Sequence, residues 1–125
     1  MKRTELSIKV WSIYLFVLGF SMVIMPSATV GMFGYLNTGE LWMRFVGILS
    51  VVLAMFYMQI ARYHLHEMYT WKIAGHIFGM VCMVSFLASG IADGRIVGTI
   101  TIELLACLWT AFALKVDKKK EKVIA

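Results

Sequence analysis

Apolar residues along this chain gather into four long runs, separated by shorter segments that contain polar residues or glycine. The runs extend from about Ile8 to Met25, Leu41 to Ala61, Trp71 to Ile91 and Val97 to Leu114. A helix needs about 20 apolar residues to cross the core of a bilayer, and roughly 17 to 25 are tolerated. Because the backbone in lipid must satisfy its own hydrogen bonds, each run predicts a transmembrane helix. We therefore expect one all-α transmembrane domain over residues 1–125, ending in a basic tail at 115–125.

Composition supports this class of protein. Hydrophobic residues make up 61% of the chain and charged residues 15%, whereas soluble domains carry roughly a quarter charged residues. The net charge of +5 would suit nucleic acid, but the basic residues lie at the ends of the runs and in the tail. A nucleic-acid surface would instead gather them on one face. Anionic lipid headgroups are the better partner for basic residues placed in this way.

The basic residues also predict how the helices are oriented. Of the twelve lysines and arginines, only Arg44 and Arg95 fall on the side opposite the N-terminus, which leaves ten on one side. Lysine and arginine gather in cytoplasmic segments, so we expect both termini and the loop from Arg62 to Lys72 in the cytoplasm. Four spans return the chain to its starting side, as this orientation requires.

Small residues on the predicted spans indicate faces suited to close helix contact. Gly47 and Ala54 lie on one stripe of the second span, and Gly75 and Gly79 form a G-x-x-x-G on the third. Helices in lipid associate through small residues and polar contacts, because lipid tails are as apolar as leucine. These faces predict a compact antiparallel four-helix bundle.

Glu103 is an acidic residue within a predicted span. It lies about seven residues into the last span, or roughly 10 Å from the outer end at 1.5 Å per residue. A charge at this depth costs at least a few kcal/mol, so we expect it to face the bundle interior and to find a partner. Arg44 is the expected partner, and Asp93 or Arg95 of the outer turn could join the pair. Two interpretations stay open: a structural ion pair, or a carboxylate that binds a proton or a cation reversibly.

His76 lies about five residues into the third span from its inner side. A neutral histidine can bond to a neighbouring helix there. A haem or metal ligand would need an opposing ligand, which only His64 and His66 of the inner loop could supply. We predict no bound metal or cofactor, and keep these three histidines as possible inner-side ligands.

Short motifs along the chain carry a resemblance to a known group of proteins. They are Leu41-Trp42-Met43-Arg44-Phe45-Val46-Gly47, Ala61-Arg62, Trp71, Gly75-His76, Ile102-Glu103-Leu104 and Trp109-Thr110. With these motifs the chain resembles small four-helix bacterial inner-membrane proteins of unknown function. The resemblance implies a fold and a bacterial inner-membrane location, and no activity. It also implies recurring polar positions at Arg44, Arg62, His76 and Glu103.

Function is the least determined property. We find no G-x-S-x-G, H-E-x-x-H or phosphate-binding glycine loop, so we do not expect an enzyme. Our leading hypothesis is a non-enzymatic membrane protein that works through helix–helix contacts, as an accessory or assembly subunit or as a homo-oligomer. A second hypothesis is a small transporter or ligand-binding protein that uses Glu103 and Arg44. A third is a haem, copper or quinone protein that uses His76.

Overall fold

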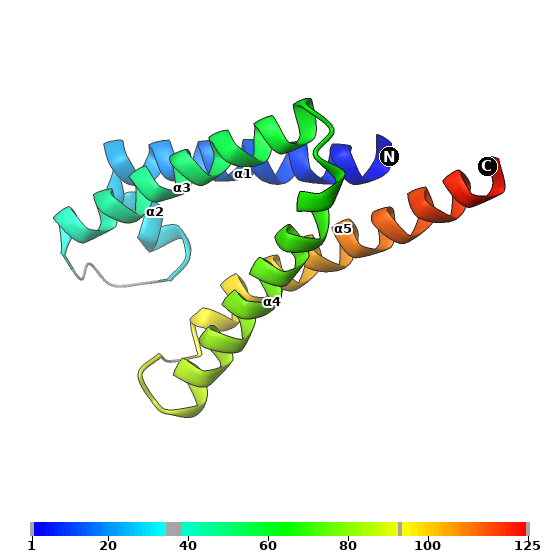
Figure 1. Ribbon diagram of the computed structural model, residues 1–125. Helices are drawn as coiled ribbons and strands as arrows, with labels where there is room; N and C mark the ends of the chain where they lie inside the picture. The colour runs from blue at the N-terminus through cyan, green and yellow to red at the C-terminus, as the bar shows by residue number, and fades with distance from the viewer. Residues whose placement is uncertain (1, 35–38, 93, 125) are drawn as a thin grey trace.

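The chain is helical almost throughout (Figure 1). The computed structural model describes residues 2–34, 39–92 and 94–124. Within these ranges the helices are α1 (Lys2–Ile24), α2 (Pro26–Met32), α3 (Glu40–Arg62), α4 (His66–Ala88) and α5 (Ile96–Ile124). Four of them, α1, α3, α4 and α5, are long and apolar enough to cross a membrane. The predicted all-α class with four membrane-length helices is confirmed.

The helices extend beyond the predicted spans at both ends of the chain. α1 begins at Lys2 rather than near Ile8, and α5 continues through the basic tail to Ile124. Hydropathy marks only the length of helix that suits lipid, whereas lysine and glutamate also favour helix outside it. α1 and α5 therefore continue as unbroken helices from the predicted spans into the polar residues near the two ends of the chain.

The connection between the first two spans contains a short helix that the hydropathy pattern does not predict. α2 begins at Pro26, and proline is favoured in a first turn because its missing N–H needs no partner there. α2 contacts both α1 and α3. Of the two charged residues expected in the outer turn, Asp93 lies outside the described residues and Arg95 is exposed just before α5.

The long helices form two pairs. α1 and α3 run side by side, and α4 and α5 form a second pair that diverges from the first (Figure 1). The pairs meet mainly through α1 and α5, where the start of α1 lies against the last turns of α5. The two ends of the chain therefore lie at the same end of the molecule (Figure 1).

Two glycines allow α1 and α3 to approach closely. A Cβ on Gly47 would lie 2.7 Å from the carbonyl oxygen of Gly19, and a Cβ on Gly19 would lie 2.7 Å from that of Gly47. Ser12 adds a hydrogen bond, donating from Oγ to the carbonyl oxygen of Ala54 at 2.7 Å. α1 and α3 thus pack through small residues and polar contacts, as helices in lipid do.

Buried apolar side chains are few and lie mainly between α1 and its neighbours. Seven of the twelve within the described residues form two clusters, Ile8, Ala61, Tyr69 and Leu114 in one and Trp11, Leu15 and Ala54 in the other. Many large apolar side chains point outward instead, such as Leu49, Phe78 and Phe112, which are 68%, 72% and 67% exposed. Apolar surface on this scale marks contact with lipid or with another protein.

Gly47→Ala should destabilise the protein by about 1–3 kcal/mol, because the added methyl group overlaps the backbone of α1. The matched control is Gly98→Ala on α5, where an added Cβ meets no atom within 4 Å. Alanine should be neutral or mildly stabilising there, since it favours helix over glycine. Thermal unfolding in detergent, followed by circular dichroism, compares the two. Equal melting temperatures would contradict the close approach of α1 and α3.

Candidate functional site

Three ionisable side chains meet between α4 and α5. Lys72 and His76 are four residues apart on α4, so they lie on one face of that helix. They are only 2% and 4% exposed. Glu103 of α5 contacts His76 with 24% of its side chain exposed. We refer to these three residues as the Lys72–His76–Glu103 triad, and ionisable groups in a membrane span are candidates for function.

The triad is joined by two hydrogen bonds through the imidazole ring. His76 Nδ1 lies 2.5 Å from Glu103 Oε2, and His76 Nε2 lies 2.9 Å from Lys72 Nζ. With Lys72 protonated, its ammonium group only donates, which assigns Nε2 as the acceptor and places the ring proton on Nδ1, toward the carboxylate. The histidine is then neutral, and a cation and an anion lie on opposite sides of its ring.

The ammonium group of Lys72 has further partners on other helices. It donates to Thr110 Oγ1 at 3.0 Å, and it lies 5.6 and 5.7 Å from the ring centres of Trp11 and Tyr57. Aromatic faces attract a cation within about 6 Å, and more strongly where water is excluded. Trp11 also meets His76 edge to face, with ring centres 4.8 Å apart. α1 and α3 thus help to hold the charges that α4 and α5 carry.

Hydrogen bonds continue from Lys72 toward the end of the molecule where the chain begins and ends. The hydroxyl oxygens of Thr110 and Ser7 lie 3.1 Å apart, and Ser7 Oγ donates to the carbonyl oxygen of Thr4 at 2.7 Å. Thr4 donates from its backbone N–H and its hydroxyl to Asp117 Oδ2, at 2.9 and 2.8 Å. The link through Thr4 is a backbone carbonyl, which accepts a hydrogen bond but has no proton to pass on. These contacts therefore fix Lys72 between α1, α4 and α5.

The polar groups of this network are fully paired. Within the described ranges, no buried side-chain nitrogen or oxygen lacks a hydrogen-bond partner. A buried polar network that is fully satisfied makes its surroundings rigid, whereas a partly satisfied one is costly. The triad is thus held in one arrangement by its neighbours.

An apolar groove between α1 and α5 adjoins the triad. Its volume is about 240 Å³, somewhat below the about 300–1,000 Å³ of typical small-molecule sites. Trp11, which contacts His76, and Ser7, which contacts Thr110, form part of the wall. The rest of the wall is formed by Val10, Tyr14, Ile102, Leu105, Ala106 and Trp109.

Arg44, the predicted partner of Glu103, lies elsewhere. Its Nη1 donates to the carbonyl oxygen of Val23, near the end of α1. In the part of the chain that the structure describes, no ion pair joins Arg44 to Glu103, whose partner is His76. The helix pairing explains the difference, because α3 packs along α1 whereas α5 packs against α1 and α4.

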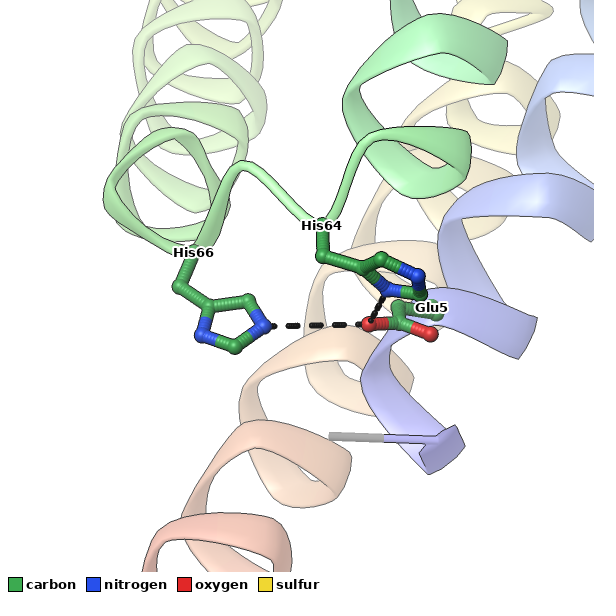
Figure 2. A group of neighbouring side chains, drawn as sticks. All are labelled: Glu5, His64 and His66. Atoms are coloured by element: carbon green, nitrogen blue, oxygen red, sulfur yellow. Dashed lines mark hydrogen bonds and ion pairs between the residues drawn. The ribbon is translucent and has the colours of Figure 1, made fainter.

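His64 and His66, the predicted inner-side ligands, do not join His76. Figure 2 shows them at the turn between α3 and α4, with both rings directed toward Glu5 of α1. His64 Nδ1 lies 2.7 Å and His66 Nε2 lies 3.8 Å from Glu5 Oε1. Both ring nitrogens of His76 are bonded within the triad, so in this arrangement His76 has no nitrogen free for haem iron or copper.

Lys72 and Glu5 are the site residues that the sequence does not single out. In the sequence, Lys72 is one of the basic residues that flank the loop after the second predicted span, and Glu5 precedes the first predicted span. The four-residue spacing of Lys72 and His76 is a signal that could have found the lysine, since it places both on one helix face. Glu5 gives no such signal, because its partner His64 is 59 residues further along the chain.

A double-mutant cycle tests whether the two charges of the triad interact. Glu103→Gln should destabilise the protein, because it leaves the Lys72 ammonium buried without its anion. Such a loss costs about 3–5 kcal/mol when both partners are buried, and less here since Glu103 is partly exposed. The variant that combines it with Lys72→Met should lose less than the sum of the single changes, by about 0.5–3 kcal/mol. Unfolding of the four proteins in detergent measures this, and strictly additive losses would show no interaction.

Comparison with protein-family models, with curated proteins and with solved structures gave no match to this chain. The resemblance to small four-helix bacterial inner-membrane proteins therefore stays a prediction. What the chain shows is a small all-helical protein with four apolar helices.

Proposed function

We propose that this chain is a small transporter or ligand-binding membrane protein whose Lys72–His76–Glu103 triad binds and releases a proton. One observation carries the proposal: a carboxylate and an ammonium group are held on opposite sides of one buried imidazole ring. Chains of acidic residues and histidines inside a membrane protein are typical of proton relays. In this proposal His76 and Lys72 take the place that the sequence suggested for Arg44.

Charge balance favours the exchange of protons at the triad. With Lys72 charged, His76 neutral and Glu103 ionised, the two charges cancel. A proton added to Glu103 would leave Lys72 as a buried cation without its anion, a state that costs several kcal/mol. A neutral form of the triad arises when Nε2 of His76 takes a proton from Lys72 as Nδ1 passes its own proton to Glu103, which leaves all three groups uncharged. Glu103, the partly exposed member, then exchanges its proton with the surroundings.

The groove between α1 and α5 supports a role in binding a ligand. Trp11 contacts His76 and also lines the groove, so a change of protonation in the triad alters the surroundings of one groove wall. Because the wall is almost entirely apolar, the class of ligand that suits it is a lipid-soluble molecule with few polar groups.

The same proposal includes an orientation. We infer an antiparallel arrangement of four spans in a bacterial inner membrane, with both termini in the cytoplasm. The distribution of lysine and arginine supports it, as does the position of both chain ends at one end of the molecule (Figure 1). The basic end of α5 would then lie against anionic lipid headgroups.

Infrared difference spectroscopy during a pH titration tests the proton exchange directly, because it detects the C=O stretch of a protonated carboxyl group. The protein is reconstituted in lipid vesicles, and wild type is compared with Glu103→Gln. We expect a carboxyl band that appears as the pH falls in the wild type and is absent from the variant.

The control for this experiment is Glu67→Gln, which removes an exposed carboxylate at the start of α4 and should keep the band. Glu103→Asp keeps a carboxyl group at the site and should shift the band rather than remove it, which separates a lost titration from a lost fold. Identical spectra from wild type and Glu103→Gln would refute proton binding by the triad.

A second candidate function, contact with another membrane helix, is favoured by an open glycine face on α4. A Cβ added at Gly75 or Gly79 would meet no atom within 4 Å, whereas Gly19 and Gly47 are already packed together. A G-x-x-x-G face is a common dimerisation surface in membranes, because it lets two backbones approach closely. In this function the chain is a homo-oligomer, or an accessory or assembly subunit of a partner membrane protein, and it carries out no reaction.

Replacement of Gly75 and Gly79 by leucine should abolish such a complex, since the larger side chains keep a second helix away. Cross-linking in native membranes, followed by purification in mild detergent, detects the complex. The control is Ala88→Leu, which is exposed on the opposite face of α4 and should leave the complex intact. A wild-type chain that is strictly monomeric and without a partner would rule the contact function out.

A further inference from the structure

A second group of ionisable residues lies at the turn between α3 and α4 and is separate from the triad. Glu5 comes from the first turns of α1, His64 from the turn itself and His66 from the start of α4 (Figure 2). Each offers one ligand atom, and these atoms all lie within 4.8 Å of one another. Residues so distant in the sequence meet here because α1 packs along α3 and brings its first turns to the end of α3.

The carboxylate of Glu5 is held in place by the protein. Its side chain is 11% exposed, and the buried Tyr69 hydroxyl donates to Oε1 at 3.0 Å. Hydrogen bonds from surrounding side chains orient the ligands of metal sites in this way. The side chains of His64 and His66 are 65% and 46% exposed, so an ion can reach them from solvent.

His64 adopts a backbone conformation that is rare for residues other than glycine. Its φ is +54°, in the left-handed region. With this backbone, Nδ1 of the ring lies at Glu5 (Figure 2). Strained backbone conformations gather at functional sites, where the surrounding structure maintains them.

His66 is held near Glu5 by an ion pair and by its ring contact with Tyr69, whose ring centre lies 5.3 Å away. Its Nε2 lies 3.8 Å from Glu5 Oε1, beyond hydrogen-bond distance, yet it is directed at the same oxygen as His64. Ligand atoms at about 2.0–2.2 Å from a tetrahedral zinc ion lie about 3.3–3.5 Å from one another. The two observed distances, 2.7 and 3.8 Å, lie on either side of that value. The ligand atoms of the two histidines also lie within 4.8 Å of each other, so side-chain movements alone can bring all three atoms around one ion.

We infer that Glu5, His64 and His66 bind a divalent transition metal, and that Zn²⁺ fits the site best. Two histidines and one glutamate form a known ligand set for zinc, with a fourth position open to water. Other first-row divalent ions also accept nitrogen and oxygen ligands, so the set defines a class of ion. The bound ion ties the α3–α4 turn to the start of α1. This inference goes beyond the proposed function and does not depend on it.

Titration of Zn²⁺ alone into the purified full-length protein in detergent tests the site by calorimetry. The wild type should bind one Zn²⁺ per chain. The variant that combines His64→Asn with His66→Asn removes two ligands. Its affinity for Zn²⁺ should fall by more than the about 10- to 100-fold that follows when only a hydrogen-bond partner of a ligand is removed. Co²⁺ gives an independent readout, because its visible absorption should appear with the wild type and be absent from the double variant.

The matched control is Glu67→Gln, which removes the same charge as Glu5→Gln from the residue after His66 and should bind Zn²⁺ like the wild type. Glu5→Gln should lose Zn²⁺ binding. If this buried substitution impairs folding, the double histidine variant still tests the site, because His64 and His66 are exposed. Tyr69→Phe should weaken binding by about 10- to 100-fold, because it removes the hydrogen bond that orients Glu5. Equal affinity of the wild type and the double histidine variant would overturn the inference.

Discussion

A positive charge on Lys72, buried between the helices, must be balanced, and the groups that balance it come from all four long helices. The anion comes from α5, the imidazole from α4, and the aromatic faces from α1 and α3. Each of these contacts weakens if one helix moves, because charge interactions in a medium of low polarity are strong and depend on distance. The charged centre thus specifies the meeting of the two helix pairs, for which lipid-facing side chains give no preference.

Different kinds of interaction hold the two helix pairs together. α1 and α3 meet through van der Waals contact between Gly19 and Gly47, which does not depend on ionisation. The contacts between α4 and α5 include groups whose charge depends on bound protons, Lys72, His76 and Glu103. Under the proposed function, a change of protonation acts on the contacts of the second pair, whereas the contact between Gly19 and Gly47 stays as it is.

The sequence was sufficient for the elements and insufficient for their contacts. Hydropathy finds four helices because crossing a bilayer demands a minimum apolar length, whatever the neighbours are. Glu103 could be recognised as a residue in need of a partner. Whether that partner is Arg44 or His76 depends on which helices are neighbours, and many ways of pairing the four helices bury a similar apolar area. The roles of Lys72 and Glu5 were not predictable for the same reason. Gly75 and Gly79 show the same difficulty: the motif is suited to helix packing, but the sequence does not reveal whether the partner helix belongs to the same chain.

The buried position of Lys72 has a consequence for the insertion of the helices into a membrane during synthesis. When α4 has been synthesised and α5 has not, the helix carries an ammonium group whose counter-ion does not yet exist. His76 and the rings of Trp11 and Tyr57 can already contact the ammonium group at this stage, but none of them supplies an anion, and a long lysine side chain without one extends toward the headgroups. Arrival of Glu103 draws the side chain back to His76. The last two helices are therefore expected to settle into the bilayer together, as one hairpin, after the first pair has already assembled.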